Sequence, residues 1–324
     1  MKKNFLLSVM LLFTMTAGAQ ILNVHKTDGT MYSIPTDEID YINFIPRDSV
    51  RRIHVEVGIA DEATTTRIGQ RRAPVTTKST LTSFSMHGVY SGIYNYEASR
   101  ATEEYPWILN RDTWPDEVSD KTPVPFYAHD GGNFNNVTDP YIRFTIAEDA
   151  PNQHDLLVAS DTVAYAGTND VGVVPLIFDH ACAAVNFNVL MSNKLATDPA
   201  WGGKTLTVNS IILRNVYWDG KYYFNNPHWD IVTGSGFAYY TLTNGDITVT
   251  TVEQALPSNS LFIIPQNRTA SDSLNTTTDM YLEVNYTVTG NDPASVNIPL
   301  SVNWVQGRQY TINIKLGTTL IKYQ

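Results

Sequence analysis

The sequence predicts an all-β fold built from antiparallel β-sandwiches, and three observations lead to this prediction. Short runs of alternating apolar and polar residues recur roughly every 8 to 14 residues after Leu81, with Gly, Pro, Asn and Asp between them. Residues 81–159 contain no stretch with sustained helical periodicity. The apolar and charged fractions, 43% and 17%, are typical of a chain that buries a globular core.

The first 19 residues have the three parts of a secretory signal peptide. Lys2 and Lys3 precede the apolar run FLLSVMLLF, and small residues at positions 17 and 19 follow it at cleavage spacing. The apolar run is shorter than the roughly 20 residues that span a bilayer. We therefore predict cleavage between Ala19 and Gln20, export of the mature chain, and no direct membrane span.

The only cysteine, Cys182, excludes an internal disulfide. Free cysteines are among the most buried residues, so we predict that Cys182 is a small buried apolar residue rather than a nucleophile. A bacterial lipoprotein carries its lipid on a cysteine directly after the cleavage site. Gln20 occupies that position, so the sequence predicts no lipid anchor there.

Two short segments are expected between the signal peptide and the first sandwich. Residues 20–48 contain two β-rich runs around Asp28-Gly29, which is a strong hairpin signal. Residues 49–80 are rich in Thr and Arg, and we predict that they form an exposed linker or a first strand that is open to proteolysis. This segment holds Arg52, Arg67 and Arg72, and Arg47 lies just before it.

The remaining chain is expected to form two sandwich domains, for which a length of 324 residues leaves room. The turn-rich stretch AGTNDVG (166–172) predicts the boundary between them. The N-terminal β-sandwich domain then covers residues 49–172, and the C-terminal one covers residues 173–324.

The chain ends on an amphipathic strand within VNWVQGRQYTINIKLGT (302–318). Tyr310, Ile312, Ile314 and Leu316 alternate with polar residues, so one face of the strand is expected to be buried. Either this strand closes its own sandwich, or another molecule uses it.

No catalytic, metal or cofactor site is predicted. The chain lacks HExxH, paired CxxC, Walker, dinucleotide-binding and twelve-residue calcium motifs. The pairs His129-Asp130, His154-Asp155 and Asp179-His180 are adjacent in sequence, and neighbours on a strand point to opposite faces, so adjacency alone makes no dyad. A secreted hydrolase with a dispersed site around His154, Asp155 and Asp179 is the weakest alternative function.

The charge balance limits the partners. A formal net charge of −10 and an isoelectric point near 5.1 argue against nucleic acid and anionic lipid headgroups as ligands.

The aromatic-rich stretch NVYWDGKYYFNNPHWDI (215–231) allows a second function. Trp218, Tyr222 and Trp229 could form a platform that stacks on sugar rings, which would make the chain a carbohydrate-binding module. They could equally be half-buried aromatics of a hairpin that turns at Asp219-Gly220. We favour the hairpin, because alternating aromatics are ordinary in strands.

Five stretches, in this order, resemble the fimbrillin (Mfa-like) families of Bacteroides-type gut and oral Gram-negative anaerobes. Each motif alone is weak, and their order over residues 81–316 makes the resemblance fairly specific. The stretches are VPFYAHDGG (124–132), QHDLLVAS (153–160), VPLIFDHACAAVNFNV (174–189), LFIIPQ (261–266) and VNIPLSVNWVQGRQYTINIKL (296–316).

The resemblance implies two tandem transthyretin-like sandwiches and a non-enzymatic pilus subunit, either stalk or accessory. It places the protein at the cell surface, in a fimbrium or associated with the outer membrane, after transit through the periplasm. The implied partners are other pilin-like subunits, including copies of the same chain in a homopolymer, or host and bacterial surface ligands.

The resemblance also implies a maturation step. In such proteins an arginine-directed protease removes an N-terminal segment with the first strand, and the exposed groove accepts a strand from the next subunit. Arg47, Arg52, Arg67 and Arg72 are the candidate cleavage sites.

Two features modify this expectation. Pilins of this class usually travel as lipoproteins, and Gln20 in place of cysteine favours an accessory or secreted member over a polymerising stalk subunit. The Trp304-x-x-Gly307-x-x-Tyr310 frame favours strand 310–316 as a permanent part of its own domain. The tail TTLIKYQ (318–324) is then the alternative donor.

Overall fold

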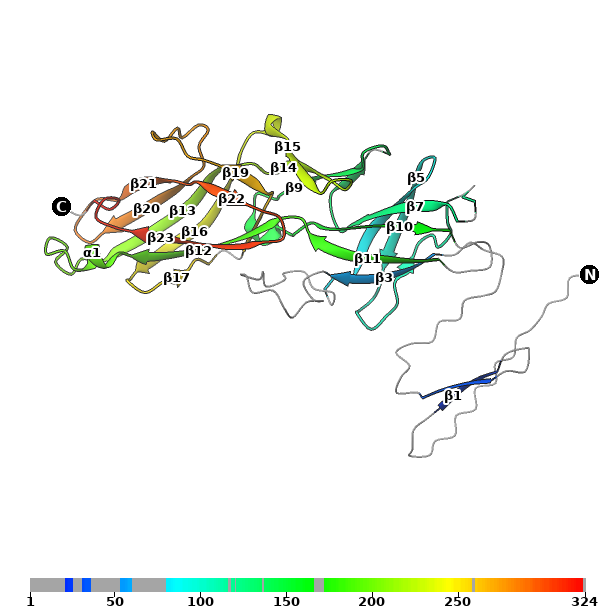
Figure 1. Ribbon diagram of the computed structural model, residues 1–324. Helices are drawn as coiled ribbons and strands as arrows, with labels where there is room; N and C mark the ends of the chain where they lie inside the picture. Colours follow the sequence, from blue (N-terminus) through cyan, green and yellow to red (C-terminus); the bar gives the residue numbers. More distant parts are fainter. Residues whose placement is uncertain are drawn as a thin grey trace, which may run out of the picture. The chain divides into compact units, whose positions relative to one another are not determined.

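The computed structural model describes a nearly all-β chain, which confirms the predicted fold class (Figure 1). Helical structure in the described residues is limited to α1 (Asn193–Ala196), η2 (Ala150–Asn152) and η3 (Thr233–Ser235). The described residues are 21–25, 31–35, 53–59, 80–115, 118–119, 121–135, 137–165, 172–257 and 260–322. The predicted signal cleavage site (Ala19, Gln20) and the candidate protease sites (Arg47, Arg52, Arg67, Arg72) lie outside them.

The chain divides into two compact units. The smaller unit comprises Met1–Asp48 with Glu104–Pro106. In it, β1 (Ile21–His25) and β2 (Met31–Pro35) pair antiparallel, from Ile21 opposite Pro35 to His25 opposite Met31. This pairing is the one that the Asp28-Gly29 hairpin signal predicts. The larger unit contains all the other strands.

The N-terminal part of the larger unit is a seven-stranded sheet, called the N-sheet below. Every neighbouring pair in it is antiparallel except β3 and β11, which run parallel. Its buried face carries a core that includes Trp114, Phe126 and Phe178. In spatial order its strands are β3 (Ile53–Ile59), β11 (Gly172–His180), β10 (Leu157–Ala164), β7 (Pro123–His129), β4 (Ser83–Val89), β5 (Ile93–Ser99) and β6 (Ile108–Leu109).

The C-terminal part is a β-sandwich, called the C-sandwich below. One sheet has the order β16 (Ala238–Val249), β13 (Leu206–Val216), β20 (Tyr281–Val288) and β21 (Ala294–Pro299). In the other, β12 (Ala183–Met191) pairs antiparallel with β17 (Gln254–Ala255) and β18 (Leu261–Ile263), and parallel with β23 (Gln309–Leu316). A short pair, β19 (Gln266–Arg268) and β22 (Val302–Trp304), lies beside them. Buried residues of both sheets belong to one core.

A third sheet combines strands from both predicted domains. Its order is β15 (His228–Ile231), β14 (Asp219–Tyr223), β9 (Tyr141–Thr145) and β8 (Asn133–Asn135). The aromatic hairpin β14–β15 therefore pairs with a strand that precedes the predicted boundary.

The boundary predicted between residues 172 and 173 does not coincide with a change of sheet. β11 begins at Gly172, pairs with β10 and β3, and continues the N-sheet as far as His180. The turn-rich stretch before it lies between two strands of one sheet. Turn residues mark the end of a strand whether the next strand joins the same sheet or another, so they misplace the boundary here.

Terminal strands close both parts of the larger unit in the same way. The N-sheet begins with β3 and ends with β11, and these two strands pair in parallel. The C-sandwich begins with β12 and ends with β23, which also pair in parallel (Figure 1). Only Ala181 and Cys182, both fully buried, separate β11 from β12. The expectation that Cys182 is a buried apolar residue is confirmed.

Candidate strand-exchange site

The edge strand β3 is attached to the N-sheet along one side only. It stands at the end of the strand order and pairs with β11 from Ile53 opposite Gly172 to Ile59 opposite Phe178. Its backbone N–H group at Ile53 also donates to the carbonyl oxygen of Asp112 at 2.7 Å. Within the described residues no further strand covers its outer edge.

The side chains of β3 nevertheless form part of the core. Ile53, Val55 and Ile59 are buried, and Val57 packs against the same cluster. Burying a large aliphatic side chain contributes about 2 kcal/mol. The four side chains together therefore contribute on the order of 6–8 kcal/mol, before the entropic cost of ordering the strand.

The start of β11 is shaped by a close contact. A Cβ atom on Gly172 would lie 2.2 Å from the Trp114 ring, so only glycine fits there. Trp114 in turn packs edge-on against Phe126, with 5.6 Å between ring centroids. A large ring held in the core thus lies next to the Ile53 end of β3.

The predicted closing strand, β23, is paired within its own chain. It runs parallel to β12 from Gln309 opposite Ala184 to Leu316 opposite Met191. Ile314 and Leu316 are buried, whereas Tyr310 and Ile312 are half-buried and pack against the same core. Strand β23 thus occupies a place on β12 like that of β3 on β11.

The C-terminal tail, the alternative donor, is also packed where the structure describes it. Ile321 is 2% exposed, and its backbone N–H group donates to the carbonyl oxygen of Gly317 at 3.0 Å. The Lys322 N–H group donates to the Tyr286 hydroxyl at 2.9 Å. The described part of the tail therefore belongs to the C-sandwich.

The proposed sugar platform is not assembled from three accessible rings. Tyr222 is buried, and its burial raises the pKa of its hydroxyl to about 12. Trp218 is half-buried and donates through Nε1 to the carbonyl oxygen of Ser235 at 3.3 Å. Trp229 alone of the three lines a groove of about 450 Å³, together with His228 and Asn267. Its Nε1 donates to the carbonyl oxygen of Ala181 at 2.8 Å, which fixes the ring.

The residues of the hydrolase alternative do not form an open site. Asp155 binds Nδ1 of His180 through Oδ2, and both side chains are almost fully buried. Asp155 Oδ1 also accepts from the Cys182 backbone N–H at 3.1 Å. His154 is exposed and lies edge-on to Phe144, and Asp179 is exposed on β11. The Asp155–His180 pair is therefore a structural contact that, with the Cys182 hydrogen bond, holds the β11–β12 junction.

The family of the chain is shown by its sequence. The profile of the fimbrillin-like family matches residues 76–324, which is more than half of the chain. The chain belongs to the fimbrillin-like family. The prediction made from the five motifs is confirmed.

Solved structures resemble this fimbrillin-like chain in fold. A fimbrial protein from Bacteroides vulgatus aligns with a TM-score of 0.52 at 18% identity, over 82% of this chain and 95% of that chain. A candidate cell adhesion protein from Parabacteroides distasonis aligns with a TM-score of 0.55 at 8% identity, over 81% and 88%. Neither the family nor these two structures is described as an enzyme. No curated protein matches the sequence.

Sequence analysis missed a histidine pair in this fimbrillin-like protein. The Nε2 atoms of His87 on β4 and His129 on β7 lie 2.9 Å apart. The Phe134 ring stacks on the His87 ring, with 4.1 Å between ring centroids. Burial lowers the pKa of both rings, to about 4 for His129, whose pKa the neighbouring His87 lowers further. The two residues are 42 positions apart, so only the β4–β7 register brings them together.

The residue after His129 in this fimbrillin-like chain, Asp130, carries a half-buried carboxyl group. Asp130 Oδ1 accepts from the backbone N–H of Leu157 at 2.7 Å. Burial, and secondarily the nearby carboxylate of Asp155, raise the pKa of Asp130 to about 7.

None of the helices in the described residues is long and apolar enough to cross a membrane.

Proposed function

We propose that the protein is a non-catalytic cell-surface fimbrial component, a pilus subunit or an accessory one, that accepts a strand from another subunit in place of β3. Family membership supports the fimbrial role. The observation that carries strand acceptance is the attachment of β3, an edge strand whose apolar side chains complete the core. Its replacement by another strand that pairs with β11 would be β-augmentation.

The position of β3 supports two of the four candidate cleavage sites over the other two. β3 covers Ile53–Ile59, so cleavage after Arg47 or Arg52 would leave it joined to the rest of the chain. Cleavage after Arg67 or Arg72 would separate β3 from the N-sheet at the covalent level. We therefore propose Arg67 and Arg72, with the adjacent Arg71, as the maturation sites.

The incoming strand must match what β3 supplies. It should pair in parallel with β11 and place about four apolar side chains at alternate positions, as β3 does. Strand β23 has this pattern, but its withdrawal from β12 would expose about as much core as its insertion covers. The tail offers the consecutive apolar residues Leu320 and Ile321 instead of an alternating set. We propose that the donor strand comes from a different subunit, which makes this protein an acceptor and favours an accessory role.

Limited digestion with an arginine-specific protease tests this proposal. We expect cleavage after Arg67, Arg71 or Arg72, a thermal midpoint lowered by at least 5 °C once β3 is removed, and recovery on adding a synthetic β3 peptide, IHVEVGI. A loss of several kcal/mol of buried apolar contact supports a shift of that size. The midpoint is measured by calorimetry, and assembly is followed by SDS-resistant ladders and microscopy.

Two sets of variants make the test specific. Replacing Arg67, Arg71 and Arg72 with lysine should abolish the fall of the thermal midpoint on digestion. The same change at Arg47, Arg51 and Arg52 should leave that fall intact. A clipped protein that stays monomeric, melts as before and binds neither peptide nor partner strand would contradict strand acceptance.

The groove lined by Trp229 supports a second candidate function, glycan binding. It joins a half-buried indole to the polar side chains of His228, Gln266 and Asn267. An aromatic ring with a few convergent polar groups is the usual composition of a small-ligand site. In this proposal the protein uses the groove to hold a surface glycan.

Glycan retention on the intact protein tests this candidate. We expect Asn267→Ala with His228→Ala to reduce retention at least tenfold with an unchanged thermal midpoint, because both side chains are exposed. Trp229→Ala should also abolish retention, but it removes the Ala181 hydrogen bond and is a less clean variant. Retention by the double variant equal to that of the wild type would exclude this groove.

A further inference from the structure

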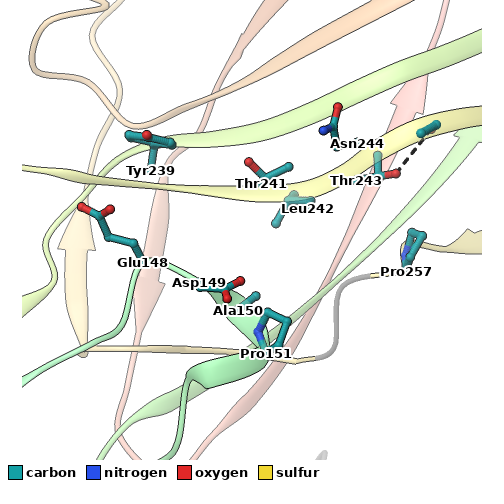
Figure 2. A pocket seen from close by; sticks show the side chains of 11 residues that line it. Glu148, Asp149, Ala150, Pro151, Tyr239, Thr241, Leu242, Thr243, Asn244 and Pro257 are labelled. Carbon is teal, nitrogen blue, oxygen red and sulfur yellow. Dashed lines mark hydrogen bonds between the residues drawn. The ribbon is translucent and has the colours of Figure 1, made fainter.

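A second groove lies beside strand β16 of the C-sandwich. It has a volume of about 560 Å³ and is called the β16 groove below. Figure 2 shows Tyr239, Thr241 and Asn244 of β16 along one wall, and Glu148, Asp149 and Pro151 across the opening. The wall opposite β16 is thus the start of η2 together with the two residues before it.

The groove follows the edge of β16 and not one of its faces. Successive side chains of a strand point to opposite faces, so a hollow over a face is lined by every second residue. Here the consecutive residues Thr241–Gly245 all line the groove. Leu242, which points into the core, and Thr241, which is exposed, both reach it. This is the arrangement expected where a strand presents its backbone edge.

This backbone edge is open for pairing. Among the described residues, β16 has one neighbour in its sheet, β13, and ends the strand order. The run AYYTLTN (238–244) contains no charged residue and no proline. Proteins usually protect an exposed edge strand with charges, prolines or bulges. The pairing with β13 does shift register within this run, between Thr243 and Thr241 and again between Tyr240 and Ala238, so bulges are the one protective feature that the run has.

The other edge of the same sheet shows the contrast. Strand β21 follows Asp292-Pro293 and ends at Pro299. A proline cannot donate to a ladder, and charge beside an edge discourages pairing. In this sheet, residues 238–244 of β16 therefore form the edge that neither charge nor proline protects, and the β16 groove lies beside it.

The charge of the opposite wall indicates what would fill the groove. Glu148 and Asp149 both line it, and no lysine or arginine does. Asn152 Nδ2 donates to Asp149 Oδ2 at 2.9 Å, which orients that carboxylate. The nearby Arg214 lies over the Tyr239 ring at 5.2 Å but bonds Glu283 through Nε at 3.1 Å. A basic side chain opposite Glu148 and Asp149 would complement this wall.

We propose that the β16 groove binds an extended segment of a partner protein, which pairs with β16 as an added strand and places a lysine or arginine against Glu148 and Asp149. Backbone hydrogen bonds along Tyr239–Gly245 supply the pairing, and the two carboxylates select the sequence. This site is separate from β11, and it operates with β3 still in place. It gives the protein a second point of attachment to another chain.

Binding of designed peptides to the intact mature protein tests the proposal. The probes are extended peptides of alternating Thr and Val with one central Arg, and the same peptides with Glu in place of Arg. A third set carries backbone N-methyl groups at alternate residues, which removes the N–H donors on one edge of the peptide. It is made in two forms, one methylated at the odd positions and one at the even positions. At about 1 mM, which detects even a weak complex, we expect the Arg peptide to slow hydrogen exchange at residues 239–245. The Glu peptide should bind at least tenfold more weakly than the Arg peptide. One of the two N-methylated forms, the one that lacks the N–H groups facing β16, should not bind.

Matched variants locate the site. Thr241→Lys adds a charge at an exposed position of β16, and Asn297→Lys makes the same addition at an exposed position of β21. We expect Thr241→Lys, and Glu148→Gln with Asp149→Asn, to weaken binding at least tenfold, and Asn297→Lys to leave it unchanged. Absence of protection at residues 239–245 with every peptide would overturn the proposal. Equal weakening of peptide binding by Asn297→Lys would overturn it as well.

Discussion

Replacement of Asp155 by alanine is expected to lower the free energy of unfolding by about 3–5 kcal/mol. The carboxylate holds His180 through Oδ2 and the Cys182 backbone through Oδ1, and the side chains of Asp155 and His180 are 0% and 2% exposed. Its removal leaves a buried imidazole and a buried N–H group without this acceptor. Denaturation by urea, followed by tryptophan fluorescence, measures the change.

The chain offers a matched control for this variant. Asp230 lies 3.8 Å from Nε2 of His228, and their side chains are 63% and 45% exposed. Alanine at Asp230 should change the free energy of unfolding by less than about 0.5 kcal/mol, because exposed pairs contribute little. Asp155→Asn keeps an oxygen for the Cys182 N–H and should cost less than Asp155→Ala. Similar losses of the free energy of unfolding for Asp155→Ala and Asp230→Ala would show that the buried pair does not stabilise the β11–β12 junction.

Replacement of Asp130 by asparagine is expected to stabilise the protein by about 2–4 kcal/mol at pH 8. Burial raises the pKa of Asp130 to about 7, against about 3.8 in the unfolded chain, so ionisation above pH 7 opposes folding. A tenfold change in proton affinity corresponds to about 1.4 kcal/mol. Asparagine keeps the oxygen that accepts from the Leu157 N–H and carries no charge. Urea denaturation at pH 8 measures the gain.

The same variant should change the pH dependence of stability. The folded state holds the Asp130 proton between about pH 4 and 7, so this group makes the wild type more stable as the pH falls. His129 acts in the opposite direction, because its pKa falls from 6.5 to about 4 on folding and its stabilising contribution is lost as the pH drops through that window. Asp130 therefore offsets part of the acid lability that His129 and His87 bring, since burial lowers the pKa of His87 as well.

Asp130→Asn removes this offset and should expose acid lability. Between pH 6.5 and 4 we expect the variant to lose about 3 kcal/mol more of its free energy of unfolding than the wild type loses. Asp139→Asn, at an exposed position, should follow the wild type. A profile for Asp130→Asn that runs parallel to that of the wild type would contradict the stabilising effect of the Asp130 proton.

The strands were predictable because their side-chain pattern is local. The alternation at Tyr310, Ile312, Ile314 and Leu316 lies within one strand, and the structure has a strand at Gln309–Leu316. Its parallel pairing with β12 could not be predicted, because the partner lies more than a hundred residues away and an amphipathic pattern does not specify the direction of a neighbour. The same holds for β3 and β11.

The buried polar contacts show a different limit of sequence analysis. The sequence contains three pairs of adjacent histidine and aspartate residues. In the structure, each of these residues that makes a buried polar contact makes it with a residue outside its own pair. Asp155 meets His180, and His129 meets His87, each across strands. Side chains that are adjacent in a strand point apart, so sequence neighbours are the wrong partners to test. The edge groove along β16 also depends on which strand ends the sheet, which the sequence of β16 does not reveal.

The parallel closure of both parts of the chain has a mechanical consequence. Tension along the chain enters the C-sandwich at Ala183, the start of β12, and leaves at Leu316, the end of β23, at opposite ends of a parallel pair. It enters the N-sheet at Ile53 and leaves at His180, with the same geometry. The pull is then a shear along both ladders, and their hydrogen bonds bear it together instead of opening one after another. A strand that replaced β3 in the same direction would inherit this load, and a surface filament built this way would resist detachment by flow.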